Sequence, residues 1–473
     1  PENHILKLVH DAVDFSFINE LLESSYCKYY GRPAKEPELM VKLLVLQYLY
    51  KLSDERVIED ASLNLAYMYF LGINPDEELP DPSLLSKFRT QRLQDVTLDD
   101  IIIAFVRQCV EKGIIKNTGL SIDSTHTEAN TFKATVERVM KRLSKKIFKT
   151  LETELEEVPR DIIQEIPDYK EIDDHKKAKI IMKTFLEDTI SKVETHIDTT
   201  TIPETVKVMN TAKKILEDPK FLAQKGVRSL VDQEARVGHK SKTSHFFGYK
   251  TEFIITTEDR IITAVHTGNG AYVDGTNFNE LMELTKKSGV TVNEIYGDKA
   301  YFRKGILDTI KKYEAIPYIP VSEMAYRINE DLYAYNKDSD EWLCSQGNST
   351  YRKKYTNKKD RQSVIYYFEK EKCRNCPLRP ECIPANNTVG RVFEISINTP
   401  EFYDYSQQQK TAKFKEKYKK RACQEWKNGE MKCFHGLDRA RGYGLKSMST
   451  QAKLTALAVN IKRIGKILSS KTA

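Results

Sequence analysis

The stretch Tyr418–Lys432, YKKRACQEWKNGEMK, places four functional side chains at helical spacing. In a helix with 100° per residue, Tyr418, Arg421, Glu425 and Lys432 point within roughly 60° of one another. A carboxylate beside a phenol and two cations is unusual on one face, because such a stripe is normally apolar. The alternative without a function is a solvent-exposed helix face with one Arg421–Glu425 ion pair, which would stabilise the helix by about 0.2–0.5 kcal/mol. Two acidic residues upstream favour a functional interpretation instead.

Those two acidic residues end predicted strands. The segment 119–125, GLSIDST, predicts a buried strand that ends at Asp123, and 294–298, EIYGD, predicts a short strand that ends at Asp298. A buried carboxylate is costly unless it pairs or binds a cation, although an aspartate that caps the next element is equally compatible with the pattern at Asp123. Further strands are predicted at 246–257, 260–267 and 315–320, and helices at 277–287 and 303–313. The region therefore predicts a mixed α/β sheet with both acids at strand ends, where open sheets bind ligands.

Composition bounds the class of protein. The chain has 473 residues, enough for about two to four structural units. It contains no run of about 18 apolar residues, so we expect no membrane span. The net charge of +7 is uneven, because residues 401–473 hold 17 Lys and Arg against 6 Asp and Glu, whereas residues 151–175 hold 10 acids against 2 bases. A basic end suits phosphate contacts, although solubility alone also explains it.

Cellular location is suggested by two further features. The eight cysteines follow no pattern of a small secreted domain, and the first residues, PENHILKLVHDAVDF, lack the layout of a secretory signal. We therefore expect a reducing cytoplasm.

The first ~115 residues predict helices. Residues 36–50 form an apolar-rich helix, residues 53–73 form another that Ser53 begins and Gly72 ends, and residues 83–93 form a short one with Lys87, Arg89 and Arg92 exposed. Three helices with a basic third one suit a helix-turn-helix DNA reader, and a plain dimerisation bundle suits them equally well.

Two segments interrupt this plan. Residues 128–228 are charge-rich, with Lys and Glu at i,i+4 over an apolar stripe, and predict a coiled-coil-like helical hairpin with no chemistry of its own. Residues 321–400 predict a polar, loop-rich segment that holds Cys344, Cys373, Cys376 and Cys382. Four thiolates could hold a tetrahedral Zn²⁺, and free structural thiols are the alternative. Residues 402–433 predict a helix ending at His435-Gly436, and residues 449–468 predict a last amphipathic basic helix.

The three acids together favour phosphodiester chemistry. Asp123, Asp298 and Glu425 offer hard oxygen ligands of the kind that select Mg²⁺ or Mn²⁺. A pair of such ions can activate a water or 3′-hydroxyl and stabilise the leaving oxygen. Arg421 and Lys432 would hold phosphates or orient Glu425, and Tyr418 would contact DNA.

The chain resembles DDE-type transposases of bacterial insertion sequences over nearly its whole length. The family's Y-(2)-R-(3)-E-(6)-K signature is similar to Tyr418, Arg421, Glu425 and Lys432. SIDSTHTEAN around Asp123 and YGDKAYF around Asp298, with Lys299 and Tyr301, look like the two aspartate contexts. The stretches from YYGRPAKEPELM at residues 29–40, DQEARVGHKSKTSHFFGYK near Asp232 and CRNCPLRPEC also look familiar. One departure is Gln424, where the family more usually has an apolar residue.

The resemblance implies an RNase H-like catalytic core with a mixed β-sheet. We expect an N-terminal all-α domain at 1–115 for DNA-end binding or dimerisation, core segments at 116–129 and 229–320, a charged helical insertion at 130–228, a cysteine-containing insertion at 321–400, and core C-terminal helices at 401–473. The implied activity is Mg²⁺-dependent cleavage and strand transfer at terminal inverted repeats. The implied partners are double-stranded end and target DNA and a second copy of the chain, in the bacterial cytoplasm and associated with the nucleoid.

Two other functions are compatible with the sequence. One is a catalytically inactive, transposase-derived DNA-binding regulator, and the other is a related nuclease that cuts without joining. The three intact acids argue against the regulator, because a mere binder gains nothing from unpaired carboxylates near phosphate.

Overall fold

The structure is a computed structural model that describes residues 2–26, 35–116, 119–131, 133–219, 221, 228–241, 243–358, 361–383 and 390–472. Residues 29–34, at the start of the N-terminal stretch on which the resemblance depends, lie outside these ranges. Among the helices of the described ranges, none combines the length and apolar character needed to cross a bilayer.

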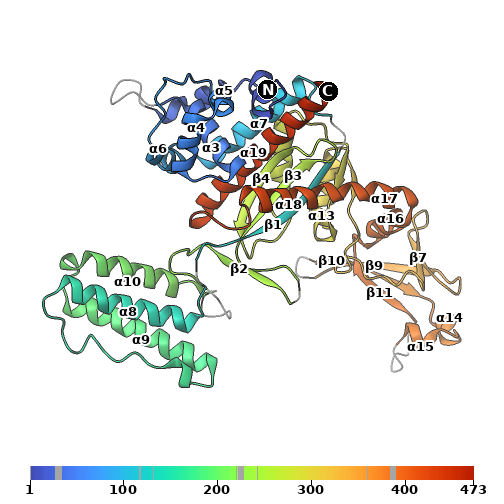
Figure 1. The fold of residues 1–473 in the computed structure, drawn as a ribbon. Helices are drawn as coiled ribbons and strands as arrows, with labels where there is room; N and C mark the ends of the chain where they lie inside the picture. The colour runs from blue at the N-terminus through green and yellow to red at the C-terminus, as the bar shows by residue number, and fades with distance from the viewer. Residues whose placement is uncertain are drawn as a thin grey trace.

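A mixed sheet lies at the centre of the molecule (Figure 1). Its strands are β1 (Leu120–Glu128), β2 (Arg236–His239), β3 (His245–Thr256), β4 (Ile262–Asn269), β5 (Glu294–Tyr296) and β6 (Ile316–Tyr318). The order is β2-β3-β1-β5-β6, with β4 also paired to β3. The strands paired to β3 run antiparallel to it, whereas β5 runs parallel to both β1 and β6. The predicted mixed α/β sheet is therefore present.

The crossovers of this sheet are helical, as predicted. Helix α12 (Phe278–Lys287) connects β4 to β5, and α13 (Lys304–Lys312) connects β5 to β6. The β3–β4 hairpin turns at Arg260, a non-glycine residue with φ of 59°. The strands predicted at 246–257 and 260–267 place the turn between them, close to this residue.

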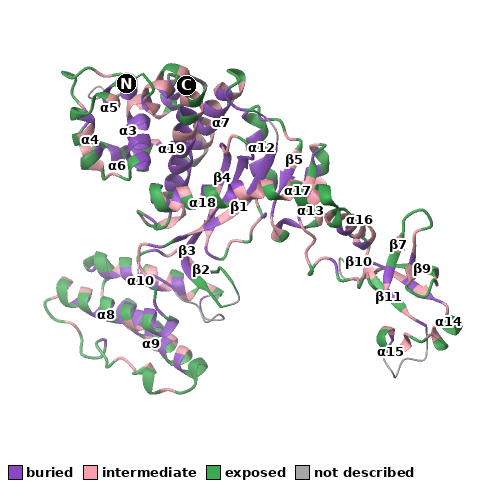
Figure 2. Ribbon diagram, turned by 45° about the vertical axis from the view of Figure 1, so that its right-hand side comes forward, coloured by how far each residue is buried: buried purple, intermediate pink, exposed green. Residues whose placement is uncertain are grey.

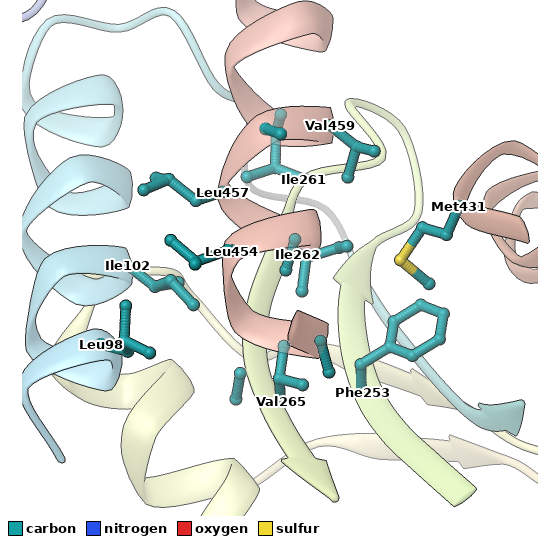
Figure 3. Close-up of a cluster of buried hydrophobic side chains, with 14 of the residues drawn as sticks. Leu98, Ile102, Phe253, Ile261, Ile262, Val265, Met431, Leu454, Leu457 and Val459 are labelled. Atoms are coloured by element: carbon teal, nitrogen blue, oxygen red, sulfur yellow. The ribbon is translucent and has the colours of Figure 1, made fainter. Parts of the chain in front are cut away.

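The last helix, α19 (Gly444–Thr472), is buried along much of its length and is not the amphipathic basic helix predicted at 449–468. Residues 448–461 are all buried, and the helix packs against β4, α18 and the N-terminal helices (Figures 2 and 3). Asn460 accepts from the backbone N–H of Ile262 at 2.8 Å and donates to its carbonyl at 2.7 Å. The sequence obscured this role because buried polar residues such as Asn460 and Lys453 interrupt the apolar pattern.

The N-terminal region is helical, as predicted, and its helices pack onto α19. They are α1 (Ile5–Ala12), α2 (Phe17–Leu22), α3 (Pro37–Tyr50), α4 (Asp54–Leu63), α5 (Leu65–Leu71), α6 (Pro82–Lys87) and α7 (Asp95–Glu111). The single helix predicted at 53–73 is two helices, because Asn64 accepts from the N–H groups of Ala66 and Tyr67 and begins a second one. One hydrophobic cluster extends from these helices into the central sheet.

Two of the three basic side chains expected to be exposed here are engaged inside the protein. The Arg89 guanidinium pairs with Asp54 at 2.5 Å, and Arg92 lies 4.7 Å from the centroid of the Tyr26 ring. Only Lys87 is exposed. The basic face of a DNA-reading helix is therefore weaker than the sequence suggested.

In its described residues, the charged segment after β1 forms three α-helices, not a hairpin of two. Helices α8 (Val136–Glu154), α9 (His175–His196) and α10 (Pro203–Leu216) enclose their own hydrophobic cluster. This three-helix bundle projects from the end of β1 away from the N-terminal helices (Figure 1). The third helix was missed because its start depends on Pro203, which follows a short threonine-rich turn.

The cysteine segment is rich in strands, which corrects the loop-rich prediction. It contains β7 (Tyr333–Asn336), β8 (Glu341–Cys344), β9 (Thr350–Lys358), β10 (Arg361–Phe368) and β11 (Val392–Ser396), with the short helices α14 (Lys370–Arg374) and α15 (Arg379–Cys382). A third hydrophobic cluster forms around Trp342. The chain then returns to the sheet through α16 (Thr399–Lys410) and α17 (Ala412–Tyr418).

Candidate active site

Asp123 lies in the middle of β1, not at its end. The strand continues to Glu128, and Asp123 is paired across the sheet with Phe253 on β3. Its side chain is 16% exposed, and burial raises the pKa of this carboxyl to about 6, although the nearby Arg421 and the N–H of Ser124 act in the opposite direction. The strand turns polar from Asp123 onwards, where Ser and Thr follow, so the sequence did not show where the strand ends.

Asp298 lies two residues after β5, which ends at Tyr296 and is therefore shorter than the predicted strand at 294–298. The parallel register pairs Leu120 with Ile295 and Ser121 with Tyr296, and Asp123 and Asp298 each follow two residues after the last of these pairs. The Asp298 charge contributes to raising the pKa of Asp123. The Asp298 carboxylate also accepts a hydrogen bond from the N–H of Ala300 at 2.8 Å and begins the 3-10 turn Lys299–Tyr301.

A buried cluster of Glu252, Tyr272 and Tyr301, which the sequence analysis did not predict, holds this turn in place. The Tyr301 hydroxyl donates to Glu252 at 2.7 Å, and the Tyr272 hydroxyl donates to the other oxygen of the same carboxylate at 2.7 Å. Glu252 is fully buried, and its burial raises its pKa. The Tyr301 side chain also packs against Gly297, where a Cβ would lie 3.3 Å from the tyrosine ring. The only available signal was the alternation of β3, which turns Glu252 inward.

Glu425 reaches this site on α18 (Ala422–His435), which crosses β1 (Figure 1). The Arg421 guanidinium joins the two elements: Nη2 lies 3.1 Å from Asp123 Oδ2, and Nη1 lies 3.2 Å from Glu425 Oε1. Asp123 and the other acidic side chains nearby raise the pKa of Arg421 against the effect of burial. The Glu425 side chain itself is 68% exposed and open to a ligand.

The four signature residues do not lie on one continuous helix, which corrects the prediction. Tyr418 ends α17, a 3-10 turn covers Lys419–Arg421, and α18 begins at Ala422. Tyr418 stacks on Phe414 with ring centroids 5.8 Å apart. The Arg421–Glu425 pair survives because the backbone stays close to helical through the turn.

Lys432 and Lys299 lie away from the carboxylates. The Lys432 ammonium lies 3.1 Å from Nδ1 of His126, in a cavity of about 510 Å³ that Lys240 also lines. Burial and the Lys240 charge lower the pKa of Lys432 to about 8. Lys299 is exposed, 3.8 Å from Glu323.

Gln424, the departure from the family pattern, holds α18 in place. Its side chain is fully buried and donates to the carbonyl of Phe253 at 3.3 Å, on the residue that pairs with Asp123. Met431 packs on the ring of Phe253 from the same helix (Figure 3). A polar residue at a position that is usually apolar was the signal that could have revealed this contact.

Metal-binding capacity follows from the donor set. Within the described ranges, no three His, Cys, Asp or Glu side chains form a group that could hold one metal ion as they stand. Asp123 and Glu425 nevertheless converge on a single cationic group, and carboxylate oxygens are what Mg²⁺ and Mn²⁺ prefer. A buried carboxylate with a raised pKa gains most from a cation, so the residues fit a divalent ion.

The four candidate zinc ligands line one small cavity of about 30 Å³. Cys344, Cys373, Cys376 and Cys382 are free thiols there. The backbone N–H of Arg391 lies 3.5 Å from the Cys373 sulfur. The Arg391 guanidinium donates to the backbone carbonyl of Cys382 at 2.9 Å. Thiolates are soft ligands that suit Zn²⁺.

Comparisons with known proteins bear on this arrangement. A family described as "Transposase domain (DUF772)" matches residues 1–91, and one described as "Transposase DDE domain" matches residues 343–465. The second match includes Glu425 and the candidate zinc cysteines, whereas Asp123 and Asp298 lie outside both. No curated protein matches the chain. Among solved structures, a piggyBac transposase synaptic complex with hairpin DNA matches with 9% sequence identity and a TM-score of 0.30. The alignment covers 98% of this chain and 78% of the piggyBac chain. With one match at each end, the predicted resemblance to DDE-type transposases is confirmed for residues 1–91 and 343–465: the chain carries a transposase domain at its start and a transposase DDE domain towards its end.

Proposed function

We propose that the chain is a metal-dependent transposase that cleaves DNA at the terminal inverted repeats of an insertion sequence and joins the 3′-hydroxyl ends to target DNA. The observation that carries the proposal is the Arg421 guanidinium, which contacts Asp123 on β1 and Glu425 on α18. The end of β5 next to β1 and the effect of the Asp298 charge on Asp123 support including Asp298 in the site. A mixed sheet with one acid on β1 and another just after the neighbouring β5 is compatible with an RNase H-like core.

Asp123, Asp298 and Glu425 would hold Mg²⁺ or Mn²⁺. When bound, such ions activate the attacking water or 3′-hydroxyl and stabilise the leaving oxygen. The protein's own groups prepare the site: burial raises the pKa of Asp123, and the Arg421 charge acts against this and favours the ionised carboxylate. Glu425 is exposed on the open side, where a phosphodiester can approach.

The supporting residues would bind the DNA backbone. Lys432 shares its cavity with the cations Lys240 and Arg439 and the carboxylates Glu128 and Asp438, and Lys240 lies 3.7 Å from Glu128. Lys432 itself lies next to His126 and would be the cation available to a phosphate. Tyr418, three residues before Arg421, and the exposed Lys299, next to Asp298, would also contact DNA.

The remaining assignments complete the proposal. Residues 1–115 bind DNA ends or a second copy, residues 116–129 and 229–320 with 401–473 form the catalytic core, and residues 130–228 and 321–400 are insertions, the second with a structural Zn²⁺. The protein acts as a homodimer or larger assembly on paired ends, in the bacterial cytoplasm at the nucleoid.

Strand-resolved analysis of a labelled end duplex with Mg²⁺ tests the function. Asp123→Asn, Asp298→Asn and Glu425→Gln should each abolish cleavage and leave DNA binding largely intact, whereas Glu416→Gln, on an exposed residue of α17, should not. A variant that still nicks at the wild-type rate removes its residue from the site. Wild-type protein that binds without cutting is a regulator, and one that cuts without producing joined products is a nuclease.

A further inference from the structure

Helix α8 carries a straight basic stripe formed by Arg138, Arg142, Lys145 and Lys149. Their offsets of 0, 4, 7 and 11 residues place them within roughly 60° of one another over a length of about 16 Å. All four side chains are exposed, and the opposite side of the helix is buried in the bundle. The stripe is therefore a solvent-facing edge of the three-helix bundle.

The stripe is unpaired, whereas several other lysines of the same bundle are paired with carboxylates. On α9 and α10, Lys183, Lys192, Lys207 and Lys213 each lie within 3.4 Å of a carboxylate. Within the described residues, the four stripe cations have no such ion pair. Like charges at i,i+4, as in Arg138–Arg142 and Lys145–Lys149, destabilise a helix, so the stripe costs stability unless an anionic partner covers it.

The position of the bundle connects the stripe to the reacting strand. β1, which carries Asp123, leads through Glu128 into the bundle, and the chain leaves it towards β2. At the base, the backbones of Ala134 and Arg228 exchange two hydrogen bonds of 2.9 Å. The Arg228 side chain also pairs with Asp218 at 3.1 Å. The bundle is therefore attached to the strand that holds the candidate catalytic aspartate.

We propose that the α8 stripe binds the phosphate backbone of the DNA duplex whose phosphodiester lies at Asp123. This proposal rests on the proposed function, because it assigns that duplex to the carboxylate site. Duplex DNA carries one negative charge per about 1.7 Å of its axis, so a stripe of about 16 Å faces enough phosphates to pair every cation. The contacts are to phosphates alone and carry no base specificity.

The test measures the affinity of the full chain for a transposon-end duplex at several salt concentrations in EDTA, which separates binding from cleavage. The stripe variant is Arg138→Gln, Arg142→Gln, Lys145→Gln and Lys149→Gln combined. The matched control removes the same charge from the paired cations, as Lys183→Gln, Lys192→Gln, Lys207→Gln and Lys213→Gln. Both variants keep the candidate catalytic residues.

Four lost phosphate contacts should make the slope of log K against log salt shallower by about 3 to 4 units, which corresponds to a roughly 100-fold smaller loss of affinity between 50 and 200 mM salt. The control should keep the wild-type slope within about one unit. The stripe variant should also unfold at the wild-type temperature or above, since it relieves like-charge repulsion.

Equal slopes in the stripe variant and wild type overturn the proposal. So does a stripe variant that loses self-association while its salt slope is unchanged, because the stripe then binds the acidic residues 152–174 of a second copy. Failure of the wild type to cleave in Mg²⁺ contradicts the proposed function and leaves the slope as an independent result.

Discussion

At the scale of single residues, Arg421 is unusual because one guanidinium contacts two carboxylates from distant parts of the chain. Its planar fork can direct separate N–H groups at Asp123 and Glu425, which a lysine ammonium cannot match with the same geometry. The Arg421 Nε atom is buried without a partner, so the side chain gives up one hydrogen bond to keep this position. Arg421 therefore acts as a positioning residue for both acids.

Arg421→Lys should keep the charge and lose the double contact. We expect DNA cleavage to fall about 10- to 100-fold, the usual effect of removing a group that orients metal-binding side chains. The Mg²⁺ concentration needed for half-maximal cleavage should rise with it, and a Mg²⁺ titration of the cleavage rate measures this. Unchanged rate and Mg²⁺ dependence would show that Arg421 is only a surface ion pair.

The two glutamates of α18 should separate stability from activity. Glu430 pairs with Lys427 at 2.8 Å and with Lys462 on α19 at 3.0 Å. Burial raises the pKa of Glu430, but these lysines outweigh it and lower the pKa to about 2. Glu430→Gln should therefore cost about 3 kcal/mol of unfolding free energy at pH 7. Glu425→Gln, on an exposed side chain, should cost less than about 0.5 kcal/mol and abolish cleavage.

The pH dependence follows from the lowered pKa of Glu430. The stabilisation is fully present above the unfolded pKa of about 4.3 and is lost as the pH falls through about 2. Urea unfolding of wild type and Glu430→Gln between pH 7 and pH 2 should show the difference shrinking below pH 4. A difference that stays constant over this range would mean that the ion pair contributes nothing and that the cost comes from unpaired Lys427.

At the scale of elements, strong local patterns were predictable and tertiary effects were not. The helices α3, α12 and α13 and the β3–β4 hairpin follow their apolar periods and turn residues. The acids and Arg421 were found because they match a spaced signature. The 3-10 turn before α18 and the buried position of α19 depend on packing against β1 and β4, which no local period encodes.

The cysteine segment shows the same limit. Its strand β9 carries YRKKYTNK, and a polar run of this kind resembles a loop. Only the burial of Trp342, Tyr366 and Phe393 against one another turns it into a small β-unit.

Zinc in this segment would be seen by metal analysis of freshly purified protein. We expect about one Zn²⁺ per chain, lost in Cys376→Ser, with the segment becoming sensitive to protease after chelation. Cys433→Ser, on an exposed cysteine of α18, is the matched control and should keep the metal. Zinc-free wild-type protein would leave the four cysteines as packing thiols.

At the scale of the whole molecule, the hydrophobic clusters divide the chain unevenly. The N-terminal helices, the central sheet and α19 share one cluster, whereas the three-helix bundle has its own. Ile5 of α1 lies so close to Gly465 of α19 that an added Cβ would be 2.8 Å from it. A shared core means that the N-terminal helices support the catalytic unit as well as any DNA contact they make.

Two deletions should therefore behave in opposite ways. Removing residues 1–115 exposes the apolar side of α19 and should give aggregated protein without a cooperative unfolding transition. Replacing residues 135–227 with a short Gly-Ser linker should leave a soluble core, because Ala134 and Arg228 already pair and the bundle takes its apolar cluster with it. Soluble yield and calorimetric unfolding measure both.

The variant that lacks residues 135–227 should still cleave an end duplex at low salt, where the remaining phosphate contacts suffice. Its activity should fall more steeply than that of the wild type as the salt concentration rises. A soluble, cooperative 116–473 fragment would show instead that the N-terminal helices fold as a separate unit.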